Sequence, residues 1–346
     1  MSAVRRCVAG EERTHCVVIA SVAFRNFKAL RGTSLALAPF NLIIGPNGSG
    51  KTSLIQALLQ LRSLAKLPLA GPSSPASKTH GPEMGFRFTR PYRAIEVRLG
   101  CVSELVCDML HVVPANAPRW PALKAEIARI RSYLFDHNSM AAATPRADGA
   151  ELASNGGNLA AVLATRRKLA PQVFADLKRE FMRLLPEFTA LELVDRGGGA
   201  VGLELKLGDR DIVAAENLSQ GTLYTLAVLT LAFDPAPPSI LCIEEIDRGI
   251  HPRMLREIRD ALYRLSYPKS FQLSREPVQV IATTHSPTML DLFREHPEEV
   301  VIAQKKGREA RFERLTDRTD LKELLREGSL GDMWFSGILG GVPEEK

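Results

Sequence analysis

A glycine-rich segment with one lysine carries the clearest chemistry in this sequence. Residues 45–52 read Gly-Pro-Asn-Gly-Ser-Gly-Lys-Thr, which fits the pattern G-x-x-x-x-G-K-[ST]. In that pattern backbone N–H groups face a phosphate chain, the lysine reaches the β and γ phosphates, and the Thr hydroxyl binds Mg²⁺. We therefore predict a site for ATP and Mg²⁺, with these nucleotide-binding residues: Gly45, Asn47, Gly48, Ser49, Gly50, Lys51, Thr52 and Ser53.

The flanking residues argue against a chance glycine turn. The apolar run SLALAPFNLII precedes the segment and predicts a buried strand. Between Thr52 and Leu67 apolar residues then recur at helical spacing. Strand, loop and helix thus follow in the order that phosphate binding requires.

Two adjacent carboxylates follow a second apolar strand, Ile240–Ile243. Ligands of open α/β sheets bind at the carboxyl ends of the strands. We predict that Glu244 helps Thr52 to hold Mg²⁺, and that Glu245 is the catalytic residue that orients or deprotonates the attacking water. Alone, two acids after a strand could equally begin a solvated loop; the phosphate-binding pattern favours the catalytic interpretation.

Two further residues could contact phosphate. Ser219 and Gly221, in Leu-Ser-Gln-Gly, open a predicted helix over residues 221–233, where a hydroxyl and N–H groups make an anion site. His285 follows the predicted strand VQVIATT and could hydrogen-bond the γ-phosphate. The alternatives are an ordinary helix cap for Ser219 and a structural role for a lone histidine.

The order of elements predicts one α/β domain over residues 1–346. Two or three strands are expected in 17–44, and strands at FTALELVD and VGLELKLG around the turn of Gly197–Gly199. The residues from about 103 to 190 are mainly helical in pattern, including ALKAEIARIRSYLF, and predict an inserted helical lobe. Residues about 68–85 are rich in Pro, Gly and Ser and predict a mobile loop.

Composition excludes some classes of protein. No apolar run reaches the roughly 20 residues of a membrane span, and the start of the chain lacks a signal peptide, so we expect a cytoplasmic protein without a membrane. The five cysteines form no C-x-x-C pair and predict free buried thiols: Cys7, Cys16, Cys101, Cys107 and Cys242. A net charge of +6 and a pI near 9.1 allow contact with nucleic acid without requiring it.

The four motifs in this order, with AFRNFKAL, IEEIDRGIHP and TTHSPTMLDLF, resemble ABC-type ATPases of the SMC, RecF and OLD-related group. The likeness is greatest to compact bacterial "AAA family" ABC-like ATPases, which are often encoded beside effector genes in phage-defence operons. It covers nearly the whole chain, including DGAELASNGGNLAAVL and LGDMWFSGILGG. It implies a phosphate-loop ABC-ATPase head with a mixed sheet core and an inserted helical lobe.

The resemblance also implies an assembly. Two chains would form a head-to-tail homodimer around two ATP molecules. Ser219 and Gly221 stand in the signature motif L-S-x-G and would complete the site of the opposite chain. His285 would be the switch histidine, and Glu245 the catalytic carboxylate.

Three features depart from the group's pattern. No glutamine lies between Gln60 and Gln172, so the Q-loop glutamine is missing or replaced. Glu244 stands where most relatives have Asp, and its extra methylene moves the carboxylate by about 1.5 Å, which predicts slow hydrolysis. About 60 residues follow His285, too few for the Toprim nuclease domain of OLD proteins.

Two functions remain open at this point. The first is an ATP-driven dimer switch that gates a partner effector, and the lack of an effector domain motivates it. The second is an SMC/RecF-like DNA clamp in DNA repair or sensing, motivated by the pI and by a basic stretch that could equally be a solvated helix face. That stretch comprises Arg166, Arg167, Lys168, Lys178, Arg179 and Arg183. A transporter subunit is disfavoured by the missing Q-loop glutamine and by the FRNFKAL pattern.

Overall fold

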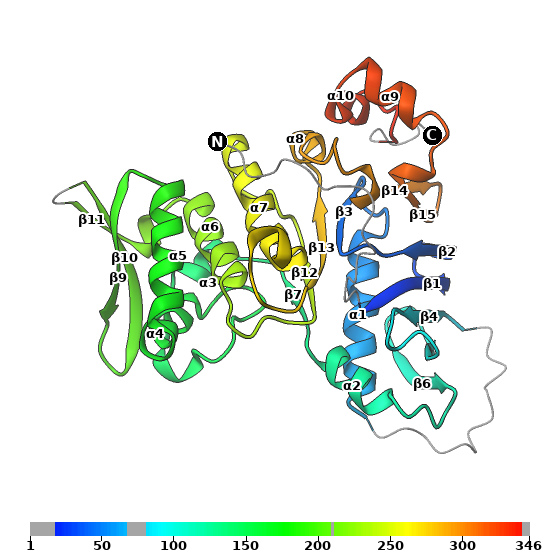
Figure 1. The fold of residues 1–346 in the computed structure, drawn as a ribbon, viewed down its shortest axis with the longest axis horizontal. Helices are drawn as coiled ribbons and strands as arrows, with labels where there is room; N and C mark the ends of the chain where they lie inside the picture. Colours follow the sequence, from blue (N-terminus) through cyan, green and yellow to red (C-terminus); the bar gives the residue numbers. More distant parts are fainter. Residues whose placement is uncertain (1–17, 68–80, 209–210, 341–346) are drawn as a thin grey trace.

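A six-stranded sheet forms the centre of the fold in the computed structural model, which describes residues 18–67, 81–208 and 211–340 (Figure 1). The strand order is β15-β14-β3-β13-β12-β7, and all strands run parallel except β15. The strands span β3 Phe40–Ile44, β7 Ile130–Tyr133, β12 Ile240–Ile243, β13 Gln279–Thr284, β14 Val300–Lys306 and β15 Glu309–Arg314. The prediction of a mixed sheet core is confirmed.

Both faces of this sheet are buried, which explains the continuous apolar runs of its strands. In β12, Ile240 and Cys242 face one hydrophobic core, while Leu241 and Ile243 face the other. Because β3, β7, β12 and β13 are parallel, their carboxyl ends lie along one edge of the sheet. We call this the carboxyl edge.

Helix α1 (Lys51–Ala65) packs between the central sheet and an antiparallel sheet of order β2-β1-β4-β5-β6 (Figure 1). Its residues Leu54, Leu58 and Leu61 are fully buried at helical spacing, as the sequence predicted. The antiparallel sheet comprises β1 Ile19–Phe27, β2 Leu30–Ala36, β4 Glu83–Phe88, β5 Glu96–Cys101 and β6 Cys107–Val113, and α2 (Trp120–Ala128) packs against α1.

The other face of the central sheet is covered by a larger group of elements. Helix α6 (Gln220–Ala232) is buried on nearly all sides, which its uniformly apolar sequence requires. Outside it lie α3 His137–Ala141, β8 Thr144–Pro145, α4 Leu159–Leu169, α5 Pro171–Leu184, β9 Phe188–Asp195, β10 Ala200–Leu207 and β11 Asp211–Ala214. Later in the chain come α7 Leu255–Ser266, α8 Pro287–Asp291, α9 Leu321–Glu327 and α10 Leu330–Phe335. Short 3-10 turns occupy Arg146–Asp148, Ala215–Asn217, Pro252–Met254, Pro268–Phe271, Pro297–Glu299 and Leu315–Asp317.

The expected helical character of residues 103–190 is wrong in two places. Residues 107–113 form β6, because they pair with β5 in a hairpin. The segment ALKAEIARIRSYLF is not one helix: α2 ends at Ala128, and Ile130–Tyr133 pair with β12 as the edge strand β7. The unsatisfied backbone groups of β12 at that edge are thereby hydrogen-bonded, a requirement that helical periodicity does not register.

The expected loop at 68–85 is corrected at its end. Residues 83–85 belong to β4, in which Met84, Phe86 and Phe88 are buried on one face. The part from 68 to 80 lies outside the described residues.

The prediction of free thiols is also wrong for one pair. The hairpin of β5 and β6 places Cys101 opposite Cys107, and the two form a disulfide. Cys242 is free and buried, and burial raises the pKa of its thiol. Cys7 and Cys16 lie outside the described residues. No helix of the described residues is long and apolar enough to cross a membrane.

Candidate functional site

The phosphate loop, residues 45–52, joins β3 to α1 at the carboxyl edge. Lys51 is buried, and its ammonium donates hydrogen bonds to the carbonyls of Gly45 (2.7 Å) and Pro46 (3.0 Å). Burial lowers the pKa of Lys51 to about 8, against the opposing charges of Glu245 and Glu244. A partly desolvated ammonium at a helix N-terminus is well suited to a phosphate.

Two details of the loop fit a bound phosphate chain. Gly50 is the N-cap of α1 with φ of 92°, and a Cβ there would lie 2.8 Å from Leu30 Cδ2, so the turn requires glycine. The Ser49 hydroxyl is buried without a hydrogen-bond partner among the described residues, which an incoming phosphate oxygen could supply. Asn47 and Gly48 are exposed at the tip of the loop, whereas Gly45 is buried below them and Ser53 is half-buried on α1.

Glu244 meets the phosphate loop directly. Its Oε2 accepts a hydrogen bond of 2.8 Å from the Thr52 hydroxyl, across 192 residues of sequence. A hydroxyl and a carboxylate held together at the end of a phosphate loop are ligands that suit Mg²⁺, which is usually bound by one or two carboxylates with phosphate oxygens and water. No group of three or more His, Cys, Asp or Glu in the described part of the chain forms a separate metal centre. These residues therefore fit the predicted Mg²⁺ role.

Glu245 is held in an unusual backbone conformation. Its φ is 52°, in the left-handed region that a non-glycine residue adopts only when its surroundings fix it. Two hydrogen bonds hold this backbone: its N–H donates to the Thr283 hydroxyl (3.0 Å), and its carbonyl accepts from the Tyr224 hydroxyl (3.0 Å). Its carboxylate lies 3.6 Å from the Arg248 guanidinium. Strain of this kind is concentrated at functional sites, where it fixes the direction of a side chain.

His285 lies at the same edge, at the end of β13. It is exposed, yet partial burial of the ring lowers its pKa, and the charge of Lys51 acts in the same direction against Asp247 and Glu245. A lowered pKa favours the neutral ring, which can donate one hydrogen bond and accept another. Thr284 supports this turn, because its hydroxyl donates to Asp247 (2.6 Å) and accepts from the N–H of Ser286 (2.9 Å).

Ser219 and Gly221 stand on a different element. Ser219 is the exposed N-cap of α6, and its hydroxyl accepts from the N–H of Thr222 at 3.1 Å. A Cβ on Gly221 would lie 2.6 Å from the Gly249 carbonyl oxygen, so α6 approaches the turn after Glu245 closely. Among the described residues, the Ser219 hydroxyl bonds only to Thr222 and to no residue of the phosphate loop. The structure thus brings together Lys51, Thr52, Glu244, Glu245 and His285. The Ser219 hydroxyl is not bonded to this group, although Gly221 packs against the turn after Glu245.

Sequence reasoning missed three residues that fix Glu245. Thr283 stands within the predicted strand before His285, and a hydroxyl in an otherwise apolar strand is a usable signal. Arg248 follows the double acid at helical spacing from Glu245 but in a turn. Tyr224 gives no signal, because α6 is buried all round and no polar face marks it.

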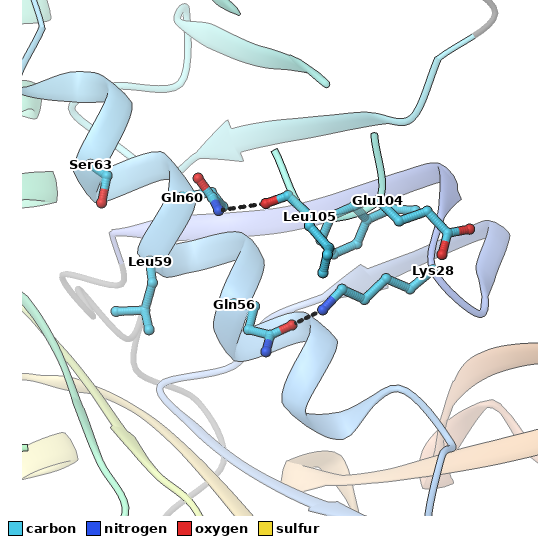
Figure 2. Close-up of a pocket in the computed structure, with 8 residues that line it drawn as sticks. Lys28, Gln56, Leu59, Gln60, Ser63, Glu104 and Leu105 are labelled. Atoms are coloured by element: carbon cyan, nitrogen blue, oxygen red, sulfur yellow. Dashed lines mark hydrogen bonds between the residues drawn. The ribbon is translucent and has the colours of Figure 1, made fainter. Parts of the chain in front are cut away.

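A cavity of about 250 Å³ lies on the flank of α1 and is distinct from the phosphate loop (Figure 2). Figure 2 shows Lys28 pointing toward Gln56, to which it donates a hydrogen bond, and Gln60 pointing toward the carbonyl of Leu105. No residue of 45–53 lines the cavity, so its lining does not belong to the predicted phosphate site.

Three of the six residues of the basic stretch form ion pairs within the chain. The Arg166 side chain is only 8% exposed and pairs with Asp234 at 2.9 Å. On α5, Arg179 pairs with Asp176 at 2.6 Å, and Arg183 pairs with Glu180 and Glu257. These contacts favour the solvated helix face for α5, and DNA binding stays a prediction.

The chain is similar to crystal structures of SMC head domains. An SMC head bound to the C-winged helix domain of ScpA superposes with a TM-score of 0.59 at 16% identity, covering 86% of this chain and 97% of that chain. A head domain with an extended coiled coil from Pyrococcus furiosus, bound to the C-terminal domain of ScpA, gives 0.56 at 15% identity, over 90% and 100%. A head domain with a coiled coil and joint from Pyrococcus yayanosii gives 0.53 at 12%, over 90% and 99%. These likenesses show that the chain has the fold of an SMC head domain, with a phosphate loop at the carboxyl edge of its central sheet.

A family model identifies the family of the chain more specifically than the fold does. The model of the AAA_21 family, described as "AAA domain, putative AbiEii toxin, Type IV TA system", matches residues 40–291, and the chain belongs to this family. No curated protein matches the sequence.

Proposed function

We propose that this ATPase is an ATP-driven dimer switch that gates a partner effector. The observation that carries the proposal is that the exposed Ser219 hydroxyl makes no hydrogen bond to the phosphate site of its own chain. The phosphate loop, Glu244, Glu245 and His285 share the carboxyl edge, whereas Ser219 presents an exposed helix N-terminus that bonds to none of them. A helix N-terminus of this kind binds anions, and a head-to-tail second copy would bring a γ-phosphate to it.

Each residue then has a defined task. Mg²⁺ and ATP would bind through Thr52, Glu244 and the phosphate loop, with the metal supplying charge stabilisation at the phosphates. Lys51 holds the β and γ phosphates, and neutral His285 donates to the γ-phosphate. Glu245 accepts a proton from the attacking water, and its backbone contacts with Tyr224 and Thr283 aim the carboxylate. The ion pair with Arg248 competes for that carboxylate, which supports slow hydrolysis.

An effector partner is supported by two facts about similar proteins. Two of the similar SMC heads are solved with domains of a second protein, ScpA, bound to them. The description of the family names a toxin of a type IV toxin–antitoxin system. Both facts suit an ATPase whose output is exerted on another polypeptide, and a role in anti-phage defence follows as part of the proposal.

The test uses Glu245→Gln in the whole chain. The amide keeps the size of the side chain but cannot take up the proton, so ATP binding should persist while hydrolysis falls by at least about 100-fold, in the range of general-base catalysis. The ATP-bound dimer should then accumulate and double the mass measured by light scattering. Glu187→Gln is the matched control, because Glu187 is exposed and directly precedes β9, 58 residues before Glu245 in the sequence. This variant should behave as the parent. A Glu245→Gln protein that stays monomeric with saturating ATP would contradict the dimer switch.

A further inference from the structure

A polar residue follows the edge strand of the central sheet at the same edge as the catalytic carboxylates. Strand β7 is parallel to β12, with Tyr133 opposite Ile243, and the N–H of Glu244 donates to the Tyr133 carbonyl at 2.9 Å. Helix α3 begins at His137, four residues after Tyr133. The chain therefore leads from the backbone beside Glu244 directly to His137.

His137 contacts the signature. Its Nε2 lies 2.9 Å from the carbonyl oxygen of Leu218, the residue immediately before Ser219. A carbonyl oxygen can only accept, so Nε2 carries the proton and donates it. The buried side chain of Leu218 and the hydrogen bond from its N–H to the Ala215 carbonyl hold the same residue through its preceding peptide. His137 thus fixes the peptide that leads into the N-cap of α6.

The support of His137 is itself rigid. Asp136 caps α3 by accepting from the N–H of Ser139 at 2.8 Å, and its own N–H donates to the Asn155 carbonyl at 3.0 Å. The hydrogen bonds from Ser139 lower the pKa of Asp136, and the positive charge of Arg248, the ion-pair partner of Glu245, acts in the same direction. These contacts hold the start of α3, from which His137 reaches the signature.

We propose that His137 is a positioning residue that links the carboxyl edge of its own chain to the signature, through the carbonyl of Leu218. It holds Ser219 and the first N–H groups of α6 in the direction that a γ-phosphate of the second chain requires. This inference rests on the proposed function, because the orientation of Ser219 matters for turnover only if a second chain brings phosphate to it. The link passes through a histidine in a chain that has no glutamine between Gln60 and Gln172.

The experiment compares His137→Ala, His137→Gln and the neighbouring exposed Asn138→Ala in the whole chain. His137→Ala should leave the dissociation constant of an ATP analogue within about twofold, because its own phosphate loop is untouched, and lower kcat about tenfold, as expected for one lost hydrogen bond that acts only in the closed dimer. In a Glu245→Gln background it should also weaken ATP-dependent dimerisation about tenfold. The amide N–H of His137→Gln can donate to Leu218 and should restore kcat to within about threefold of the parent. Asn138→Ala should match the parent.

The outcomes separate the two proposals. If Lys51→Ala hydrolyses ATP as fast as the parent, the proposed function fails and this inference fails with it. If hydrolysis depends on Lys51 but His137→Ala keeps the parent kcat, the inference alone is overturned. Equal losses in ATP affinity and kcat, or a His137→Gln protein as slow as His137→Ala, would also overturn it. The melting temperature of each variant shows whether it is folded. If His137→Ala is unfolded, the kcat of His137→Gln tests the inference in its place.

Discussion

ATP binding should weaken above neutral pH because of Lys51. Burial lowers the pKa of its ammonium from the usual 10.5 to about 8, with the charges of Glu245 and Glu244 opposing the shift. Phosphate oxygens bring negative charge to the ammonium and raise the pKa again in the complex. Binding must therefore take up a proton at any pH where the free lysine is neutral, so affinity falls as pH rises through the pKa of the free protein.

The size of the effect follows from that pKa. For one group of pKa about 8 that must be protonated in the complex, the apparent dissociation constant is larger by a factor of about 1.1 at pH 7 and about 11 at pH 9. ATP should thus bind about tenfold more weakly at pH 9 than at pH 7, which is about 1.4 kcal/mol.

Calorimetry in two buffers of different ionisation enthalpy measures both the affinity and the proton uptake, which should approach about 0.9 proton per site at pH 9. Lys51→Arg is the control, because a guanidinium stays charged throughout, and its affinity should change less than about twofold between the two pH values. A parent affinity that is equal at pH 7 and pH 9, without proton uptake, would refute the assignment of Lys51 as a buried phosphate ligand.

Two further predictions concern the signature. Ser219→Arg should keep near-parent ATP affinity but lose dimerisation and hydrolysis, because a bulky, positively charged side chain then occupies the N-terminus of α6. Light scattering measures the dimerisation and phosphate release measures the hydrolysis. Hydrolysis by a strictly monomeric variant would contradict the proposed dimer. Gly221→Ala should destabilise the fold by about 1–3 kcal/mol in urea unfolding, because its Cβ would lie 2.6 Å from the Gly249 carbonyl oxygen. Gly32→Ala, whose Cβ meets nothing within 4 Å, should change stability by less than about 0.5 kcal/mol. Equal stability of the two alanine variants would rule out the close approach of α6 to the turn after Glu245.

The phosphate loop and the strands that end at Glu244 and His285 could be predicted because each has a local signature. An apolar strand followed by a glycine turn and an amphipathic helix needs no knowledge of distant residues. The backbone of Glu245 could not be predicted, since its left-handed conformation depends on Tyr224 and Thr283, which are 21 and 38 residues away. The same holds for the strand at Ile130–Tyr133, whose conformation is decided by the free edge of β12.

Pairing between strands also explains the error at the cysteines. The spacing of Cys101 and Cys107 does not predict that they pair, because the helical pattern expected from about residue 103 conceals the hairpin that joins them. The register of the β5–β6 pairing places the two residues opposite each other. The basic stretch on α4 and α5 also divides in the structure. Arg166 is buried against Asp234, whereas Arg179 and Arg183 are exposed to solvent. Side-chain direction there depends on packing that only the folded chain supplies.

Helix α6 touches the catalytic turn twice, through the Tyr224 hydroxyl on Glu245 and through the close approach of Gly221 to Gly249. Under the proposed function, this one helix carries both Ser219, which would receive the nucleotide of a second chain, and Tyr224, which holds the backbone of the proposed base Glu245. In a closed dimer, a movement of α6 in either chain would therefore change the contacts of both nucleotides. Turnover should then be cooperative in ATP, with a Hill coefficient above 1, because occupancy of one site alters the alignment of the base at the other.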